Sequence, residues 1–447
     1  MLRITTSIRP DGTTVALEGR LAGPWVDELR ASWRSLATTR DASSIRVDLD
    51  AVTFIDTAGK ALLWAMHQQG AALTAKGVHG AGAPGRDQEE RTRAWWTDHR
   101  GERRRSMEHM NIPGTDLSPS RIGLGTWAMG GWMWGGTDEE RSIRTICAAL
   151  ERGITLIDTA PAYGQGRSEE IVGKAVARWG RRDRVVLATK VGLEWRNGEV
   201  ARNATRARIR QEIGDSLKRL RTDYVDLYQV HWPDPLVPIE ETAETLHALY
   251  REGRIRAIGV SNYSPEQMDL FRQVAPLHAA QPPYNLLERE AEERVLPYCL
   301  WHGITTLTYG ALCRGLLSGR MRADTRFGGD DLRRTDPKFQ PPRYAQYLRA
   351  VATLEHLARA RYERSVLALA VRWVLDQPGV QVALWGARSP EQLDPLDEVM
   401  GWSLDADTMR TIDGILRGIV TAPVGPEFMA PPARAGHEPG AAVQSTA

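Results

Sequence analysis

The segment Thr155–Arg178, which includes the sequence LIDTAPAYGQGRSEEIVGKA at Leu156–Ala175, contains one complete strand–loop–helix unit. Its beginning, Thr155–Asp158, has the apolar side chains and the length of a buried strand. The loop Thr159–Gly164 follows, and Glu169–Arg178 then has the apolar spacing of an amphipathic helix. A strand that leads into a helix in this way is the unit from which parallel α/β folds are built.

The same kind of unit recurs along most of the chain. Eight apolar segments are expected to be strands: Arg121–Gly125, Thr155–Asp158, Val185–Lys190, Tyr224–His231, Ile255–Ser261, His278–Gln281, Thr305–Tyr309 and Val382–Trp385. Amphipathic segments between them are expected to be helices: Glu139–Glu151, Glu169–Arg178, Arg206–Arg219, Glu240–Glu252, Pro265–Val274 and Glu290–His302. This alternation over about 300 residues predicts an α/β fold of the (β/α)₈ TIM-barrel type, with an open doubly wound sheet as the alternative.

Two helix starts have the same four residues. Ser264–Gln267 and Ser389–Gln392 both read SPEQ, which predicts a serine cap, a proline at the first helical position and a carboxylate in the first turn.

The first strand also matches a dinucleotide-binding pattern. Gly123–Ala128, GLGTWA, satisfies G-x-G-x-x-A, but that pattern has meaning only where a helix begins at the glycines. The glycine-rich loop Met129–Gly136 follows instead, and we expect the first helix near Asp138. A Rossmann fold is therefore not the favoured interpretation.

Composition narrows the kind of ligand and compartment. The 447 residues are enough for two domains, and 58 basic against 56 acidic residues give a net charge of +2, which predicts neither nucleic acid nor an anionic membrane as a partner. The three cysteines, Cys147, Cys299 and Cys313, have no metal-binding spacing, so we expect no disulfide and no metal site. The chain start has no apolar leader, and no run of about eighteen apolar residues occurs, so we expect a cytoplasmic protein.

One change of composition divides the chain. Residues Val78–Ser106 pass from a Gly/Pro/Ala turn region into mixed charges that cannot form a core, which indicates either a flexible tether or a charged helix. Met107 or Met110, followed by NIPGTDLSPS, resembles a natural protein start. We expect four parts: a first domain over residues 1–80, a linker over 81–106, a barrel over 107–430 and a flexible tail over 431–447.

Polar residues stand at the carboxyl ends of consecutive predicted strands. Asp158, Lys190 and His231 end the second, third and fourth strands, and Tyr163 lies in the loop after the second. Each alone has an ordinary structural explanation, as a helix cap, an exposed strand end, a core histidine or a packing residue. Together they predict an active site, because the loops at the carboxyl face of a barrel converge.

Several motifs follow one another in a fixed order: LIDTAPAYGQGRSEEIVGKA, VVLATKVG, DLYQVHWPDP, IRAIGVSNYS, QPPYN and YGALCRGLLSG. In these motifs, from about Ile112 to VGPEFMAPP, the chain resembles the aldo-keto reductases, in particular the bacterial general-stress and inositol-locus type. The resemblance implies a barrel enzyme that reduces small aldehydes or ketones, with Asp158, Tyr163, Lys190 and His231 as its catalytic residues.

The chemistry of these groups suggests their roles. A tyrosine hydroxyl has a reference pKa near 10 and needs help to transfer protons at neutral pH. We expect Lys190, held by Asp158, to favour the tyrosinate of Tyr163, and His231 to orient the carbonyl oxygen.

The resemblance also implies a nicotinamide cofactor. Ser261, Asn262 and Gln281 would bind its carboxamide and Tyr309 would stack on its ring, while Gly310–Gly319 would run under the pyrophosphate. The full set of cofactor residues expected is Thr126, Trp127, Ser261, Asn262, Gln281, Tyr309, Gly310, Leu312, Arg314, Gly315, Gly386, Arg388 and Gln392. Arg388, beside a helix start, suits an adenosine 2′-phosphate, so we expect NADPH rather than NADH. Pro395 and Leu396 stand where the family has Glu-Asn, which predicts a weaker hold on adenine.

Tryptophans are expected around the substrate. Trp127, Trp132, Trp134 and Trp232 lie in predicted loops of the catalytic face and would form an aromatic wall for a small carbonyl compound. Because the chain has 15 tryptophans, some of these are equally well explained as core residues.

The first eighty residues have a different pattern. Val15–Gly19 and Ile45–Leu49 are expected to be strands, and Pro24–Leu36 and Ala58–Gln69 helices. The turn around Asp56 and Thr57 resembles a STAS domain, the anti-sigma-factor antagonist fold, in which the residue at Thr57 is phosphorylated. The final strand and helix of that family are not recognisable after Gly77. Asp56 and Thr57 also suit a plain helix cap. The alternative to an enzyme is therefore a partner-switching signalling protein in which the barrel senses a cofactor.

Overall fold

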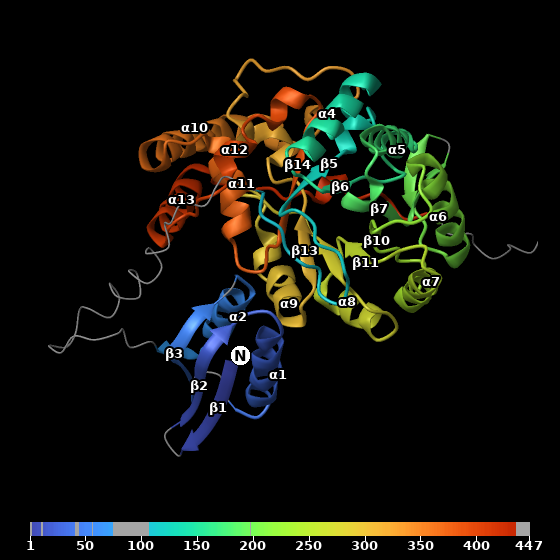
Figure 1. Cartoon of the computed structure of the whole chain (residues 1–447). Coiled ribbons are helices and arrows are strands. Elements are labelled where there is room, and N and C mark those ends of the chain that lie inside the picture. The colour runs from blue at the N-terminus through green and yellow to red at the C-terminus, as the bar shows by residue number, and fades with distance from the viewer. Residues whose placement is uncertain are drawn as a thin grey trace, which may run out of the picture. The chain divides into compact units, whose positions relative to one another are not determined.

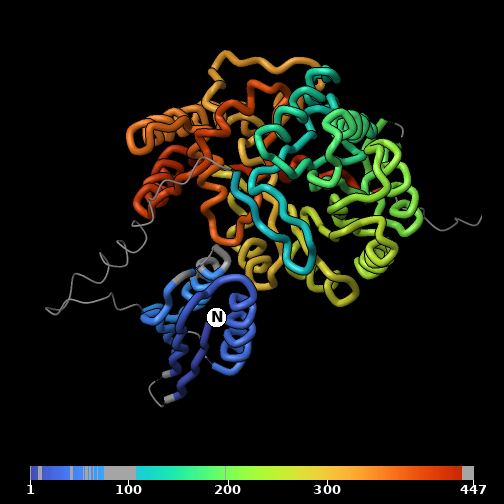
Figure 2. Tube along the Cα trace, viewed as in Figure 1, coloured from blue at the N-terminus to red at the C-terminus, as the bar shows by residue number. Residues whose placement is uncertain are grey.

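The computed structural model describes residues 2–9, 12–40, 44–55, 57–74, 107–196 and 198–434. The chain divides into two compact units, one formed mainly by the residues before the 75–106 segment and one by the residues after it (Figures 1 and 2). The charged segment predicted as a linker and the tail beyond Arg434 lie outside the described residues. Each unit is considered by itself.

The N-terminal unit is a small α/β layer. Strands β1 (Leu2–Arg9) and β2 (Gly12–Leu21) pair antiparallel, while β3 (Ile45–Ile55) pairs parallel with β2 and β4 (Ala72–Thr74) parallel with β3. Helices α1 (Pro24–Ala37) and α2 (Thr57–Gln68) supply apolar side chains to one core with β2 and β3. Residues two apart on β2, Val15 and Leu17, are both in that core, so both helices cover the same face of the sheet. The strands and helices expected here are confirmed, with longer strands than the sequence indicated.

The second unit is a closed barrel of eight parallel strands, in the order β5–β6–β7–β10–β11–β12–β13–β14. Their bounds are β5 (Ile122–Gly125), β6 (Leu156–Asp158), β7 (Val186–Val191), β10 (Leu227–Val230), β11 (Ile258–Ser261), β12 (Ala279–Gln281), β13 (Thr305–Thr308) and β14 (Val382–Gly386). Every expected strand is present, mostly shortened at its ends, and because β14 pairs with β5 the open-sheet alternative is wrong.

Helices surround these strands (Figure 1). They are α4 (Glu139–Glu151), α5 (Arg167–Trp179), α6 (Arg206–Leu220), α7 (Ile239–Arg251), α8 (Pro265–Arg272), α9 (Val295–His302), α10 (Arg343–Tyr362), α11 (Val366–Asp376), α12 (Leu396–Val399) and α13 (Ala406–Ile419). One expected helix, Glu290–His302, is in fact a 3₁₀ turn at Glu290–Glu292 followed by α9. Pro297 explains the break, because proline fits only the first turn of a helix and clashes with the residue four positions earlier.

The loop after β5 confirms that the glycine pattern is not a dinucleotide fingerprint. No α-helix begins at these glycines: a 3₁₀ turn at Trp127–Met129 follows β5, and the first α-helix begins at Glu139. Asp138 caps that helix by accepting a hydrogen bond from the Arg141 backbone N–H at 3.0 Å.

The two SPEQ segments behave differently. Ser264 and Gln267 form a reciprocal capping box at the start of α8, as expected. Ser389 precedes only a short 3₁₀ helix, Pro390–Leu393, and its side chain makes no capping bond to the backbone there. The prediction of a serine cap at Ser389 is therefore wrong, although Pro390 does occupy the first helical position.

The interior of the barrel is a packed core. Leu156, Val186, Leu227, Leu307 and Val382 project inward from five strands and bury one another. At the amino end a hairpin formed by residues 107–120 adds Ile112 and Leu117 to this core. The carboxyl end is therefore the only end of the barrel where an active site can form.

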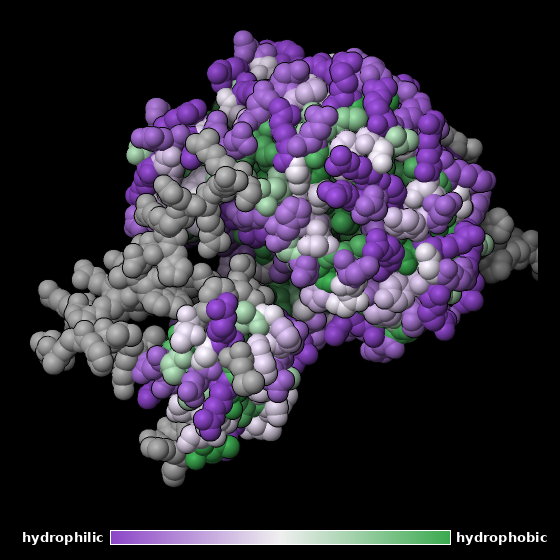
Figure 3. Space-filling model, in the orientation of Figure 1, coloured by the Kyte–Doolittle hydropathy of each residue, from purple (hydrophilic) through white to green (hydrophobic). Residues whose placement is uncertain are grey.

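The loops at the carboxyl end carry extra structure that the sequence did not reveal. After β7 comes an antiparallel hairpin, β8 (Leu193–Arg196) and β9 (Glu199–Arg202). The long segment between β13 and α10 crosses to the loop after β5 (Figure 1), where Leu332 N–H donates to the Met133 carbonyl oxygen at 3.0 Å. The visible face of the barrel unit is largely hydrophilic, with scattered apolar residues (Figure 3). Across the described parts of the chain, no helix is long and apolar enough to cross a membrane.

Candidate active site

Four polar side chains meet at the carboxyl end of the barrel. Asp158 ends β6, Lys190 lies next to the end of β7, His231 directly follows β10, and Tyr163 stands in the loop before α5. Lys190 Nζ donates to Asp158 Oδ2 at 2.6 Å and to the Tyr163 hydroxyl oxygen at 3.2 Å. The His231 ring stands edge-on to the Tyr163 ring with 5.6 Å between centroids. The structure thus brings together the four residues that the sequence singled out.

Burial determines which protons these groups carry. Lys190 is fully buried, which lowers its pKa, although the Asp158 carboxylate opposes the shift. Burial, followed by the positive charge of Lys190, holds the pKa of His231 well below its usual value. At neutral pH the imidazole is therefore uncharged and offers one N–H donor and one acceptor nitrogen.

The expected protonation state of Tyr163 is wrong for the resting protein. Burial and the negative charge of Asp158 raise the pKa of Tyr163 well above its usual value. The nearby carboxylate and the loss of water outweigh Lys190, because Lys190 is itself partnered by Asp158. Tyr163 is therefore a neutral hydroxyl, the form that can donate a proton.

A layer of buried amides lies behind Asp158. Gln281 Nε2 and Gln229 Nε2 donate to Asp158 Oδ1 at 2.9 and 3.2 Å, and Gln281 Nε2 also donates to Gln229 Oε1 at 3.2 Å. Gln281 was expected at the site, whereas Gln229 was missed. Its position on a strand that ends in His231 was the available signal, because a glutamine is rarely buried without a specific partner.

The residues expected around the nicotinamide form one network. Asn262 Nδ2 donates to the His231 carbonyl oxygen at 3.0 Å and to Ser261 Oγ at 3.1 Å. Tyr309 donates its hydroxyl proton to Asn262 Oδ1 at 3.0 Å, and Ser261 Oγ donates to the Gln281 carbonyl oxygen at 2.8 Å. Asn262 has a φ of 61°, so its position is held by these bonds against an unfavourable backbone conformation. The cofactor contacts expected of these residues remain predictions.

The segment Gly310–Gly319 is a tight loop with its arginine turned inward. Arg314 has a φ of 54° and is buried. Its Nε donates to Asp336 Oδ2 at 2.6 Å and its Nη2 to Glu288 Oε1, also at 2.6 Å. Lys338 Nζ lies 2.8 Å from the same Glu288 oxygen. In this arrangement Arg314 stabilises the loop, and the phosphate contact expected of its guanidinium remains a prediction. Leu312 and Gly315 shape the loop through a hydrogen bond of 2.9 Å from Gly315 N–H to the Leu312 carbonyl oxygen.

Arg388 lies at a corner where three arginines gather. Its Nη1 donates to the Trp134 carbonyl oxygen at 2.9 Å and its Nη2 to that of Gly136, while its backbone N–H donates to Gln392 Oε1 at 2.6 Å. Burial, then the charges of Arg333 and Arg141, lower the pKa of Arg388. Carboxylates partner two of these arginines: Asp331 Oδ2 lies 2.6 Å from Arg333 Nη2, and Glu391 Oε2 lies 3.7 Å from Arg141 Nη2. Gly386, at the end of β14, is exposed beside this corner.

Two further expected cofactor residues have structural partners. The Thr126 hydroxyl donates to the Asp158 carbonyl oxygen at 2.9 Å and lies 2.8 Å from Ser168 Oγ, fully buried. Trp127 stacks on the Tyr163 ring with 6.0 Å between centroids. Trp127 therefore covers the ring of Tyr163, whereas Thr126 is hydrogen-bonded to the end of β6.

Three of the four expected tryptophans pack against other aromatic side chains, in two groups. Trp134 contacts Trp127 edge-on at 5.4 Å, and Trp132 contacts Trp195 of β8 edge-on at 4.7 Å. Trp195 was missed because the hairpin that carries it was not predicted. Trp232 instead packs under the Arg202 guanidinium at 5.2 Å. The indole N–H groups of Trp134 and Trp195 are buried without an acceptor among the residues that the structure describes.

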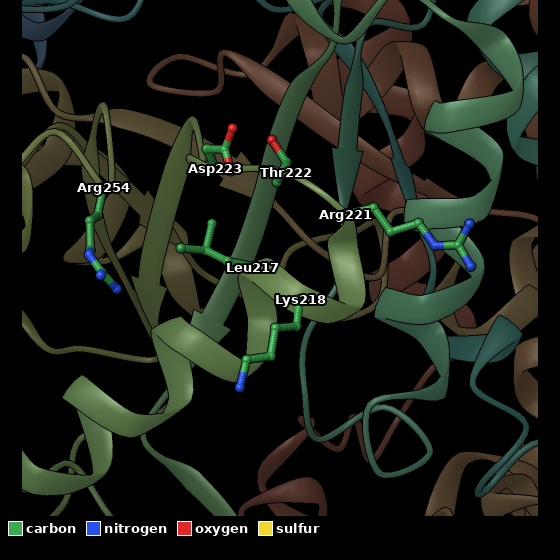
Figure 4. A pocket seen from close by; sticks show the side chains of 6 residues that line it. All are labelled: Leu217, Lys218, Arg221, Thr222, Asp223 and Arg254. Carbon is green, nitrogen blue, oxygen red and sulfur yellow. The ribbon is translucent and has the colours of Figure 1, made fainter.

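A hollow lies at the end of α6, away from the tetrad (Figure 4). It is lined by Leu217, Lys218, Arg221, Thr222, Asp223 and Arg254. The side chains of Lys218, Arg221 and Arg254 point in different directions, so they form no common binding point (Figure 4). Within the described ranges, no group of His, Cys, Asp and Glu side chains is arranged to hold a metal ion.

A closed (β/α)₈ barrel with this lysine-centred set at its carboxyl face defines a barrel oxidoreductase of the NAD(P)-dependent kind. The chain belongs to the aldo/keto reductase family, whose family model matches residues 121–417.

Known proteins are similar over this same extent. Aldo-keto reductase YhdN from Bacillus subtilis (strain 168) is 64% identical over 328 residues, covering 73% of this chain and 99% of that protein. An NADH-specific methylglyoxal reductase from Escherichia coli (strain K12) is 37% identical over 302 residues, covering 64% of this chain and 91% of that protein.

Two solved structures have the same barrel. The glycerol dehydrogenase AKR11B4 from Gluconobacter oxydans has 54% identity and a TM-score of 0.66, covering 72% of this chain and 99% of that chain. An aldo/keto reductase from Klebsiella pneumoniae, in complex with NADP and acetate, has 30% identity and a TM-score of 0.52, covering 69% of this chain and 94% of that chain.

Proposed function

We propose that this protein is an NADPH-dependent reductase of small aldehydes and ketones, with Tyr163 as the general acid. The observation that carries the proposal is the buried chain from Asp158 through Lys190 to a neutral Tyr163 hydroxyl, with an uncharged His231 beside it. This arrangement places two neutral donors where a carbonyl oxygen would gain negative charge.

The roles of the residues follow from their contacts. A bound nicotinamide supplies the hydride that reduces the carbonyl carbon. Tyr163 gives its hydroxyl proton to the carbonyl oxygen, which completes the alcohol. Lys190 Nζ, 3.2 Å from the Tyr163 oxygen, stabilises the negative charge left there, and Asp158 keeps the lysine charged and oriented. His231 donates its N–H to the carbonyl oxygen and directs it towards Tyr163. Run backwards, the same groups oxidise an alcohol.

The residues fit a nicotinamide cofactor at two places. Gln281 Oε1 accepts no hydrogen bond from any described residue, although both of its N–H groups are used, so it can accept from a carboxamide. Arg388 stands near the end of β14, and a guanidinium there suits a 2′-phosphate, which supports NADPH, although Asp331 and Glu391 partner the neighbouring Arg333 and Arg141. Two observations weigh against a preference for NADPH: one relative is NADH-specific, and the Arg388 guanidinium already donates to two backbone carbonyl oxygens.

The aromatic wall favours small substrates. Trp127 stacks on Tyr163, and the Trp127–Trp134 and Trp132–Trp195 contacts line loops of the same face. The names of two relatives, a methylglyoxal reductase and a glycerol dehydrogenase, support small polar carbonyl compounds and their alcohols as substrates.

The deciding experiment is steady-state oxidation of NADPH, and separately of NADH, with a panel of small aldehydes and ketones. We expect turnover with several of them and a preference for NADPH. Binding of either cofactor without turnover of any carbonyl compound or alcohol would contradict a reductase function.

For the N-terminal unit we propose the STAS-like interpretation, with residues 1–80 as a module and Thr57 as its phosphorylation site. The support is topological: Thr57 is the first residue of α2, and α2 comes directly after β3, where the resemblance places the phosphorylated residue. Asp56 and the Thr57 side chain lie outside the described residues. Mass spectrometry of the protein from its own cells tests this, because phosphate must be found on Thr57. No observation favours the partner-switching alternative for the whole chain.

A further inference from the structure

One buried side chain at the site has no role in the mechanism above. Gln229, in the middle of β10, is completely buried, and the side chain reaches across the barrel interior to two other strands. Its Nε2 donates to Asp158 Oδ1 at 3.2 Å, and its Oε1 accepts from Gln281 Nε2 at 3.2 Å.

The neighbouring strand is shaped to admit this side chain. Gly259 on β11 pairs with Gln229, and a Cβ added to Gly259 would come within 2.8 Å of Gln229 Cγ. Any larger residue at position 259 would push Gln229 away. The amide of Gln229 therefore crosses β11 through a gap and reaches Gln281 on β12.

The negative charge of Asp158 fixes the orientation of both amides. A carboxylate only accepts hydrogen bonds, so each glutamine must present its NH₂ group to Asp158 Oδ1. The second N–H of Gln281 is directed to Gln229 Oε1. Gln281 Oε1 is consequently the one polar atom of that side chain left to meet a ligand, and it is an acceptor.

We propose that Gln229 is a positioning residue with two effects. It holds Gln281 so that the side-chain carbonyl oxygen of Gln281 meets the carboxamide N–H of the nicotinamide, and by bonding Asp158 Oδ1 it leaves Asp158 Oδ2 for Lys190. This inference rests on the proposed function, since it concerns the same cofactor. It adds a physical link between carboxamide binding and the Asp158–Lys190–Tyr163 chain, because Gln281 and Asp158 share one hydrogen bond.

The test is a pair of binding titrations on the full-length protein, followed by tryptophan fluorescence. The ligands are NADP⁺ and 2′,5′-ADP, which lacks the nicotinamide. Gln229→Leu removes both hydrogen bonds at similar volume, and we expect its dissociation constant for NADP⁺ to rise about 3- to 10-fold, the worth of about one net hydrogen bond. The constant for 2′,5′-ADP should stay within twofold.

A matched control and a rescue variant make the result specific. Thr306→Val removes another fully buried hydrogen-bonding group of the barrel, one that bonds Gly379 and Gln381, and should leave NADP⁺ affinity unchanged. Gln229→Glu at pH 6 should bind NADP⁺ nearly as tightly as wild type. Burial beside Asp158 raises the pKa of the introduced carboxyl, and its protonated form both donates to Asp158 and accepts from Gln281.

Each outcome decides one question. Unchanged NADP⁺ affinity in folded Gln229→Leu, equal losses for both ligands, or a Gln229→Glu variant as weak as the leucine variant would each overturn the positioning role. If Gln229→Leu does not fold, Gln229→Met, which is unbranched and fills the same space, takes its place. A wild-type protein that binds neither NADP⁺ nor NAD⁺ would overturn the proposed function itself, and this inference with it.

Discussion

At the residue scale, the proposed reaction depends on the hydroxyl proton of Tyr163. The hydroxyl is neutral because burial and Asp158 raise its pKa, and Lys190 lies ready to stabilise the anion that proton transfer creates. Replacing Tyr163 with Phe keeps the ring that stacks with Trp127 but removes the donor. We expect turnover to fall about 10²-fold or more, with NADPH binding retained.

Steady-state kinetics and a cofactor titration check this. Tyr224→Phe is the matched control, because Tyr224 packs under two arginine side chains beyond the amino end of β10 and has no place at the site. Wild-type turnover in the Tyr163→Phe protein would rule out the general acid role.

His231 supplies a pH-dependent prediction. Its folded-state pKa is depressed by burial and by Lys190, so the unfolded chain binds a proton below pH 6.5 when the folded protein does not. The folded state therefore loses stability as the pH falls through 6.5, by at most about 1.4 kcal/mol between pH 7.5 and 5.5 from this group. We expect the fall in Tm over that interval to be smaller in His231→Gln than in wild type. His356→Gln, on the exposed face of α10, should follow the wild-type curve, and identical slopes for all three proteins would contradict the depressed pKa.

Arg388 tests the cofactor preference. Its guanidinium supports the loop after β5 through the Trp134 and Gly136 carbonyl oxygens, and the charges of Arg333 and Arg141 act on it. If it reads a 2′-phosphate, Arg388→Ala should raise the dissociation constant of NADPH about 10-fold or more, the worth of one charge-assisted bond, and that of NADH much less. Fluorescence titration of both cofactors against both proteins measures this. Equal losses would show that Arg388 only supports the loop.

At the element scale, the loop after β5 is held by a distant segment. Asp330, between β13 and α10, accepts hydrogen bonds from the backbone N–H groups of Met133 and Gly135 at 2.8 and 2.9 Å. That loop carries Trp132 and Trp134. Asp330→Ala should loosen the aromatic wall, and we expect the KM for a small aldehyde to rise several-fold with little change in kcat, because the tetrad lies on other elements.

Kinetics with one aldehyde at saturating NADPH provide the measurement. Asp324→Ala, an exposed carboxylate in the same segment, is the control and should change neither constant. A fall in kcat at constant KM would show that Asp330 acts in catalysis and does not shape the aromatic wall.

The elements also show what a sequence can and cannot reveal. The eight barrel strands were predictable because they are short apolar runs bounded by polar residues. The tetrad was predictable because Asp158, Lys190 and His231 stand at the ends of consecutive strands and Tyr163 lies in the loop after one of them. The hairpin of β8 and β9 was not, since LEWR and EVAR mix charged and apolar residues without a clear period. Gln229 was missed for another reason: its role depends on Asp158 and Gln281, which are far away in the sequence.

At the scale of the whole molecule, the barrel unit carries its own core and site. Its amino end is closed by residues 107–120, whose Ile112 and Leu117 join the barrel interior. Glu108 lies 3.0 Å from Arg121 Nη1 and 2.9 Å from Arg372 Nη1, and Arg372 is almost completely buried. The two arginines and the aliphatic pair tie this segment to the barrel.

A chain that begins at Met107 should therefore fold and keep most of the reductase activity, because it retains Glu108 and the whole closing hairpin. A chain that begins at Ile112 loses Glu108 and leaves Arg121 and Arg372 without that carboxylate. Removing one partner of a fully buried ion pair costs about 3–5 kcal/mol, but the Glu108 side chain is 33% exposed and Asp376 lies 2.8 Å from Arg372, so the loss is smaller here. We expect the shorter protein to have a clearly lower Tm, and thermal unfolding together with NADPH-dependent turnover of both truncated proteins measures the difference. An insoluble Met107 protein would show that the barrel depends on the residues before it, and equal melting of the two would show that Glu108 contributes nothing to stability.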